Sequence, residues 1–134
     1  MKIETFAFMR ESPFYTQYEQ LKKAGLDGGK YNGYVGFKAE LPTTWTKLAE
    51  CSEHNVLDNL VEVHGGITFD SNNINKLVAI IPLTDIPKDW YNYRIIGFDC
   101  MHCYDTEKNC PVQYIKDETM SLLKQIQKLI NNLK

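Results

Sequence analysis

The sequence predicts an α+β protein in which a largely antiparallel sheet is packed by helices, and two observations carry this prediction. Short apolar or alternating segments, typical of strands, recur between residues 3 and 100 and are separated by turn-forming glycines, prolines and asparagines. The C-terminal segment instead repeats its apolar residues at three- and four-residue spacings, which is typical of a long amphipathic helix. Strands followed by a closing helix favour α+β over an alternating α/β order.

In the first part of the chain, residues 3–9 predict a strand. A serine followed by a proline then predicts a helix over residues 12–24, with Gly25 as its C-terminal cap. The aromatic and glycine-rich residues 31–37 predict a second strand. A short helix is predicted over residues 42–49.

The middle of the chain is rich in strand signals. Residues 60–64 alternate as a strand, the two glycines at 65–66 interrupt it, and residues 67–69 continue or pair with it. Residues 77–81 form a short apolar strand ended by a proline. The last clear strand is contained within residues 90–100.

The C-terminal helix is predicted by a single apolar stripe, with lysines, glutamines and asparagines on the opposite face. The stripe consists of Ile115, Leu122, Leu123, Ile126, Leu129, Ile130 and Leu133.

Length and charge limit the class of protein. The 134 residues fit a single globular domain over 1–134, large enough to fold without a disulfide or a metal. The net charge of -2 argues against general binding to nucleic-acid backbone. No apolar run approaches the roughly 20 residues that span a membrane, and residues 1–5 lack a signal-peptide pattern. We therefore expect a cytoplasmic protein with its cysteines as thiols.

Two segments carry the residues most suited to chemistry. Residues 97–105 place two carboxylates, two thiols and an imidazole within seven positions, directly after an apolar run. Residues 63–68 place another imidazole beside two glycines. The predicted catalytic residues are His64, Asp99, Cys100, His102 and Asp105, and the predicted ligand-binding residues are Gly65, Gly66 and Thr68.

The leading hypothesis is a polar pocket that binds, and in one version hydrolyses, a small polar ligand. His64 or His102 would act as general acid or base, with an aspartate orienting the imidazole. Cys100 would be a nucleophile if an imidazole lowers its pKa. Glycine backbone beside imidazoles suits anions, so the expected ligand resembles a nucleotide or another phosphate.

Two alternatives use the same residues. Cys100 and Cys103 have the spacing of a zinc knuckle, and Cys110 or a histidine could complete it. Because a lone pair of this kind is a weak signal, the leading hypothesis has no metal, and a zinc-stapled structural protein is the alternative. The second alternative is a purely structural role, in which the cysteines are core residues, the aspartates cap a loop, and His64 is a core histidine bonded to backbone.

Three motifs resemble a family of small, uncharacterised phage and prophage proteins with the pattern GYV, VHGGLT and GFDCxHxxD. Here they are GYVG at 33–36, VHGGITF at 63–69, and IGFDCMH at 96–102 followed by Asp105. The resemblance covers roughly residue 31 to the end, but the family has a small residue in place of Cys103, which weakens the knuckle. The positions that match are His64, Gly65, Gly66, Asp99, Cys100, His102 and Asp105.

The resemblance implies a phage origin, hence the cytoplasm of the host cell, and a common site, but it implies no reaction. It also suggests a rival function, because small phage proteins often inhibit a host defence or replication protein without catalysis. That function predicts an exposed aromatic patch of the kind that anchors interfaces, made of Tyr31, Tyr34 and Phe37.

Overall fold

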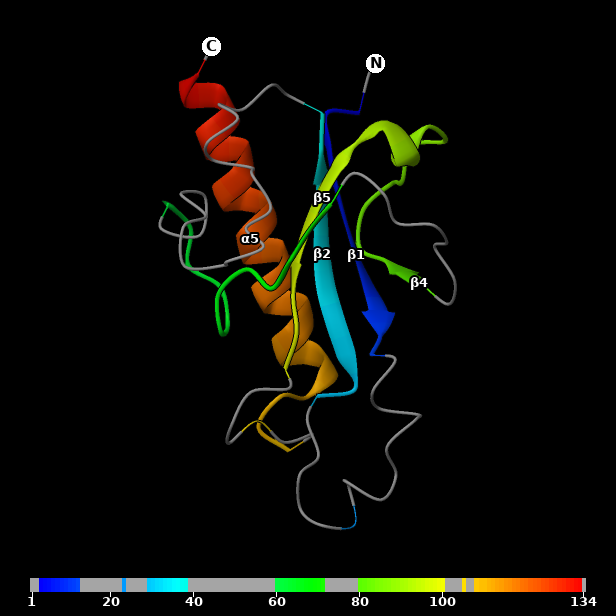
Figure 1. The fold of residues 1–134 in the computed structure, drawn as a ribbon, viewed down its shortest axis with the longest axis vertical. Coiled ribbons are helices and arrows are strands. Elements are labelled where there is room, and N and C mark those ends of the chain that lie inside the picture. The colour runs from blue at the N-terminus through cyan, green and yellow to red at the C-terminus, as the bar shows by residue number, and fades with distance from the viewer. Residues whose placement is uncertain are drawn as a thin grey trace.

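The computed structural model describes residues 3–12, 23, 29–38, 60–71, 80–100, 105 and 108–133. These residues form a five-stranded sheet with strand order β3-β5-β2-β1-β4, in which every paired strand is antiparallel, and a long C-terminal helix (Figure 1). The predicted α+β class is confirmed. The elements are β1 (Thr5–Glu11), β2 (Tyr31–Phe37), β3 (Phe69–Ser71), β4 (Ile80–Pro82), the 3-10 helix η2 (Trp90–Asn92), β5 (Arg94–Phe98) and α5 (Val112–Asn132).

The two faces of the sheet belong to different apolar clusters because side chains alternate along each strand. Ala7 and Met9 of β1 lie in the cluster that α5 covers. Phe6 and Phe8 lie on the opposite face, in a mainly aromatic cluster. Figure 1 shows α5 running alongside the sheet, over one face only.

The helix α5 contains most of the predicted stripe, and five of the seven stripe residues are buried, whereas Leu129 is half-buried and Leu133, which follows the helix, is 46% exposed. Its buried residues are Ile115, Thr119, Leu122, Leu123, Ile126 and Ile130. Burying one large aliphatic side chain contributes about 1.5–3 kcal/mol, so this stripe holds α5 on the sheet. No helix in the described part of the chain is long and apolar enough to cross a membrane.

The strand predicted over residues 60–64 is wrong. Residues 61–63 have no regular structure, and the next two residues form a turn. The pattern alternates because Val61 is buried while Glu62 is exposed. The backbone of Glu62 bonds to a side chain, however: its N–H donates to Gln125 Oε1 and its carbonyl accepts from Gln125 Nε2, each at 2.7 Å.

Other predicted elements begin at different residues or lie outside the described part of the chain. The 3-10 helix η2 occupies the start of the segment predicted to contain the last strand. The strand β3 begins at Phe69, the last residue of the strand segment predicted over 67–69. The helices predicted over 12–24 and 42–49 lie outside the described residues, except for Ser12 and the helical Lys23.

The predicted surface patch of aromatic residues is also wrong. Tyr34 is 3% exposed and Phe37 is 1% exposed, because both side chains pack within the sheet's two clusters. Only Tyr31 of the three is partly exposed.

Candidate metal centre

Four side chains able to bind a metal meet near one end of the sheet. They are His64, Cys100, Asp105 and Cys110, and one ligand atom from each lies within 4.8 Å of all the others. His64 precedes β3, Cys100 follows the end of β5 by two residues, and Cys110 precedes the start of α5 by two. Four separate points of the chain therefore supply the cluster.

A glycine turn presents His64. The N–H of Gly66 donates to the carbonyl of Val63 at 2.9 Å, and the two glycines have φ values of 69° and 81°. Positive φ favours glycine, so the pair that interrupts the predicted strand serves the turn. The amide of Thr68 donates to the carbonyl of Gly97 at 2.9 Å, so the amides of Gly66 and Thr68 both have partners within the fold.

A third glycine allows the two cysteines to come together. Gly29 donates its N–H to the carbonyl of Cys100 at 2.8 Å. A Cβ at position 29 would lie 2.7 Å from Cys100 Cβ and 3.1 Å from Cys110 Cβ. The missing side chain therefore lets the backbone close against both cysteines.

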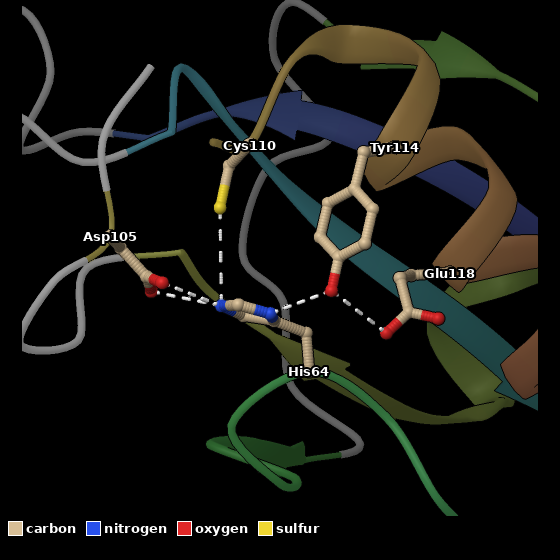
Figure 2. A network of polar contacts seen from close by, with 5 residues as sticks. All are labelled: His64, Asp105, Cys110, Tyr114 and Glu118. Carbon is tan, nitrogen blue, oxygen red and sulfur yellow. Dashed lines mark hydrogen bonds and ion pairs between the residues drawn. The ribbon is translucent and has the colours of Figure 1, made fainter. Parts of the chain in front are cut away.

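The two ring nitrogens of His64 have different surroundings (Figure 2). Nε2 lies 2.8 and 3.0 Å from the carboxylate oxygens of Asp105 and 4.0 Å from Cys110 Sγ. Nδ1 lies 2.8 Å from the hydroxyl of Tyr114, which lies 3.3 Å from Glu118 Oε1. The tyrosine hydroxyl has one proton, so two arrangements fit these distances. In one, it donates to Glu118 and its oxygen accepts from Nδ1–H; in the other, it donates to Nδ1, and Nε2–H donates to Asp105.

The position of the imidazole proton decides what Nε2 can do. With the proton on Nδ1, a neutral imidazole has a lone pair on Nε2. A lone pair facing a carboxylate at 2.8 Å is repulsive unless a cation lies between them. A metal ion is such a cation, so a metal at Nε2 requires the Nδ1–H form. Without a metal, Nε2–H donates to Asp105 and Tyr114 donates to Nδ1.

The arrangement differs from a catalytic triad. In a triad the histidine contacts the nucleophile through one nitrogen and the carboxylate through the other. Here Cys110 and Asp105 both face Nε2, and Tyr114 contacts Nδ1. Burial also raises the pKa of both the Cys100 and the Cys110 thiols, which makes them poor nucleophiles in the absence of a metal.

The four donors fit zinc. Two sulfurs and one imidazole nitrogen are the soft and borderline ligands that Zn²⁺ prefers, and an aspartate oxygen is a harder ligand that zinc also accepts. Ligands about 2.0–2.3 Å from a tetrahedral zinc lie about 3.3–3.8 Å from one another. The 4.0 Å between Nε2 and Cys110 Sγ is close to this range, whereas 2.8 Å between Nε2 and Asp105 is shorter and typical of a hydrogen bond. A metal would thus take the place of the proton, with a small movement of the carboxylate.

The cluster is enclosed to different degrees on its two sides. Cys100 is fully buried and Cys110 is 2% exposed, whereas the side chains of Asp105 and His64 are 9% and 21% exposed. The exposed side of His64 borders a hollow lined by Glu62, Val63, His64, Glu118, Ser121 and Gln125.

The structure brings together three of the predicted catalytic residues: His64, Cys100 and Asp105. Asp99 is half-buried beside Cys100 and is not among the four candidate ligands. His102 and Cys103 lie outside the described residues. Cys110, which the zinc alternative included, belongs to the cluster.

Sequence reasoning missed Gly29, Tyr114 and Glu118. The signal for the last two was their four-residue spacing on α5, which places them on one face of the helix. Burial first, and then the charge of Glu118, raise the pKa of Tyr114 to about 12, so its hydroxyl remains protonated at neutral pH.

Comparisons with protein-family models, with curated proteins and with solved structures gave no match. The resemblance to phage and prophage proteins therefore stays a prediction, and the site is interpreted from its geometry.

Proposed function

We propose that this protein binds one zinc ion through His64 Nε2, the Asp105 carboxylate and the sulfurs of Cys100 and Cys110, and that the metal has a structural role. The observation that carries the proposal is that a thiol and a carboxylate converge on a single histidine nitrogen. This convergence suits a metal ion and does not suit a triad. The second thiol of the group adds a fourth ligand.

The number and burial of the ligands favour a structural over a catalytic metal. Structural zinc sites have four protein ligands, whereas catalytic sites keep one position open for water or substrate. Four protein donors are available here, and both cysteines are almost completely buried. The metal would fasten the His64 turn and the residues after β5 to the start of α5.

The test is metal analysis of protein purified without chelator, combined with native mass spectrometry. We expect about one equivalent of zinc per chain, lost in His64→Ala and Cys110→Ser. Asp117→Asn, which changes an exposed carboxylate of α5, is the matched control and should retain the metal. Wild-type protein that takes up no zinc after exposure to the ion would contradict the proposal.

The hypothesis of a small polar ligand stays a prediction for the same site. The hollow beside His64 includes two carboxylates, Glu62 and Glu118, which favour cations and hydrogen-bond donors over phosphate. A mass excess of several hundred daltons without zinc would support a bound ligand over a metal. Binding to a host protein and a phage origin also stay predictions.

A further inference from the structure

The hydroxyl of Tyr114 connects the candidate metal centre to a carboxylate on α5. It lies 2.8 Å from His64 Nδ1 and 3.3 Å from Glu118 Oε1, and Figure 2 shows the three groups in a row, with Nε2 at the opposite end of the imidazole. The tyrosine ring also packs edge-on against the imidazole, with centroids 5.5 Å apart and an interplanar angle of 86°. Tyr114 therefore contacts His64 through both its ring and its oxygen.

We propose that Tyr114 and Glu118 are positioning residues for the metal centre, which hold His64 as the Nδ1–H tautomer and direct its Nε2 lone pair at the metal. This inference rests on the proposed function. Neither residue is one of the four candidate metal ligands. Both act through the imidazole.

The imidazole of His64 has two tautomers and two ring orientations. A free histidine has its proton on either nitrogen, and rotation of the ring exchanges the nitrogens in space. Of the two, Nε2 is the one that faces Asp105 and Cys110. The Tyr114 contact holds the ring orientation. Because Glu118 can accept from the tyrosine hydroxyl, the tyrosine oxygen can accept from Nδ1–H when a metal binds Nε2.

Glu118 sets the direction of the chain of hydrogen bonds. Its carboxylate accepts a hydrogen bond from the tyrosine hydroxyl, so that in the metal-bound protein the tyrosine oxygen is the acceptor for Nδ1–H. Hydrogen bonds in series also polarise one another, so the carboxylate increases the electron density on the imidazole. Partners of this kind behind a metal-binding histidine typically change metal affinity by about 10- to 100-fold.

The test compares Tyr114→Phe and Glu118→Gln with matched controls. Tyr91→Phe makes the same chemical change at a tyrosine that is 59% exposed, and Asp117→Asn removes a neighbouring exposed charge from the same helix. The zinc dissociation constant is measured by competition with a chromophoric chelator. We expect zinc to bind about 10- to 100-fold more weakly to Tyr114→Phe, several-fold more weakly to Glu118→Gln, and unchanged to both controls.

A second measurement separates positioning from stability. Nitrogen-15 NMR of the zinc-bound protein, with His64 assigned by its loss in His64→Ala, should show a proton on Nδ1 that exchanges slowly with water. In Tyr114→Phe that proton should exchange faster, even where enough zinc is supplied to saturate the site. A change of folding stability alone would not produce this result.

The outcomes distinguish this inference from the proposed function. Wild-type protein without zinc affinity overturns both. Zinc binding that requires Cys110 but is unchanged in Tyr114→Phe and Glu118→Gln overturns the positioning role alone. If Tyr114→Phe does not fold, Glu118→Gln decides, because Glu118 is only half-buried on the helix surface.

Discussion

Replacing Gly29 with alanine should weaken zinc binding, because the new methyl group would separate the two cysteines. The Cβ would lie 2.7 Å from Cys100 Cβ, and ordinary contacts begin at 3.4 Å. The backbone would have to retreat by about 0.7 Å, although the hydrogen bond from Gly29 N–H to the Cys100 carbonyl opposes this movement. Zinc–ligand distances tolerate only about 0.2 Å, so a shift of this size disturbs the site.

The expected loss of stability has two parts that can be measured separately. Adding a methyl group to a packed interior costs about 1–3 kcal/mol of stability, which should appear in urea unfolding of the metal-free protein. The additional stability that zinc confers on the wild type should also decrease. Ile126→Val is the matched control: it removes one methylene from a fully buried side chain, costs about 0.5–1.5 kcal/mol, and should leave the zinc increment unchanged.

The assay is urea unfolding of each variant, with saturating zinc and with chelator. A Gly29→Ala protein that loses stability but keeps the full zinc increment would refute the steric argument. It would show that the two cysteines can move together without loss of metal geometry.

Three further predictions follow from the same geometry. At a free zinc concentration 100 times the dissociation constant, binding adds about 2.7 kcal/mol to the free energy of unfolding. Removing zinc with a chelator should therefore lower the melting temperature by about 10 °C, and an unchanged melting temperature would argue against a structural metal. Since burial raises the pKa of the Cys100 and Cys110 thiols, both are protonated at pH 7 without metal. Zinc binding should therefore release at least about two protons and tighten as pH rises. Calorimetry in buffers of different ionisation enthalpy measures the number of protons released, and release of one proton or none would exclude two new thiolates. Gln125→Ala removes two hydrogen bonds to Glu62 and should cost about 1–3 kcal/mol and accelerate amide exchange over residues 61–68; exchange as slow as in the wild type would show that the metal alone holds this segment.

The fold class could be predicted because its signals are local. The spacing of Ile115, Leu122 and Ile126 defines one face of a helix regardless of what it contacts. Likewise, the aromatic and glycine-rich composition of residues 31–37 predicts β2 with the limits that the structure has. The strand predicted over residues 60–64 failed because alternation records which side chains are buried, and the hydrogen-bond partner of Glu62 was a side chain 63 positions away.

The candidate site could be predicted only in part, because its members are distant in sequence. The residues after β5 were recognised as chemically unusual, and Cys100 and Asp105 come from that segment. The local CxxC spacing predicts Cys103 as a partner of Cys100, and Cys103 lies outside the described residues. In the structure Cys110 joins Cys100 near the start of α5, and no spacing rule links either to His64.

The position of the cluster explains why a metal would matter to a fold that already has a core. The segment around His64 has no regular structure from residue 61 to residue 68, so it lacks the ladder of hydrogen bonds that fixes a strand. Its contacts include two buried apolar side chains, the hydrogen bonds of Gln125 with Glu62, the hydrogen bond from Thr68 N–H to the Gly97 carbonyl of β5, and the contacts of His64. A metal shared by His64 and the two cysteines joins this segment to β5 and α5 at a single point. Zinc would therefore supply attachment where the sheet supplies little, which is the reason that a structural metal suits this end of the molecule.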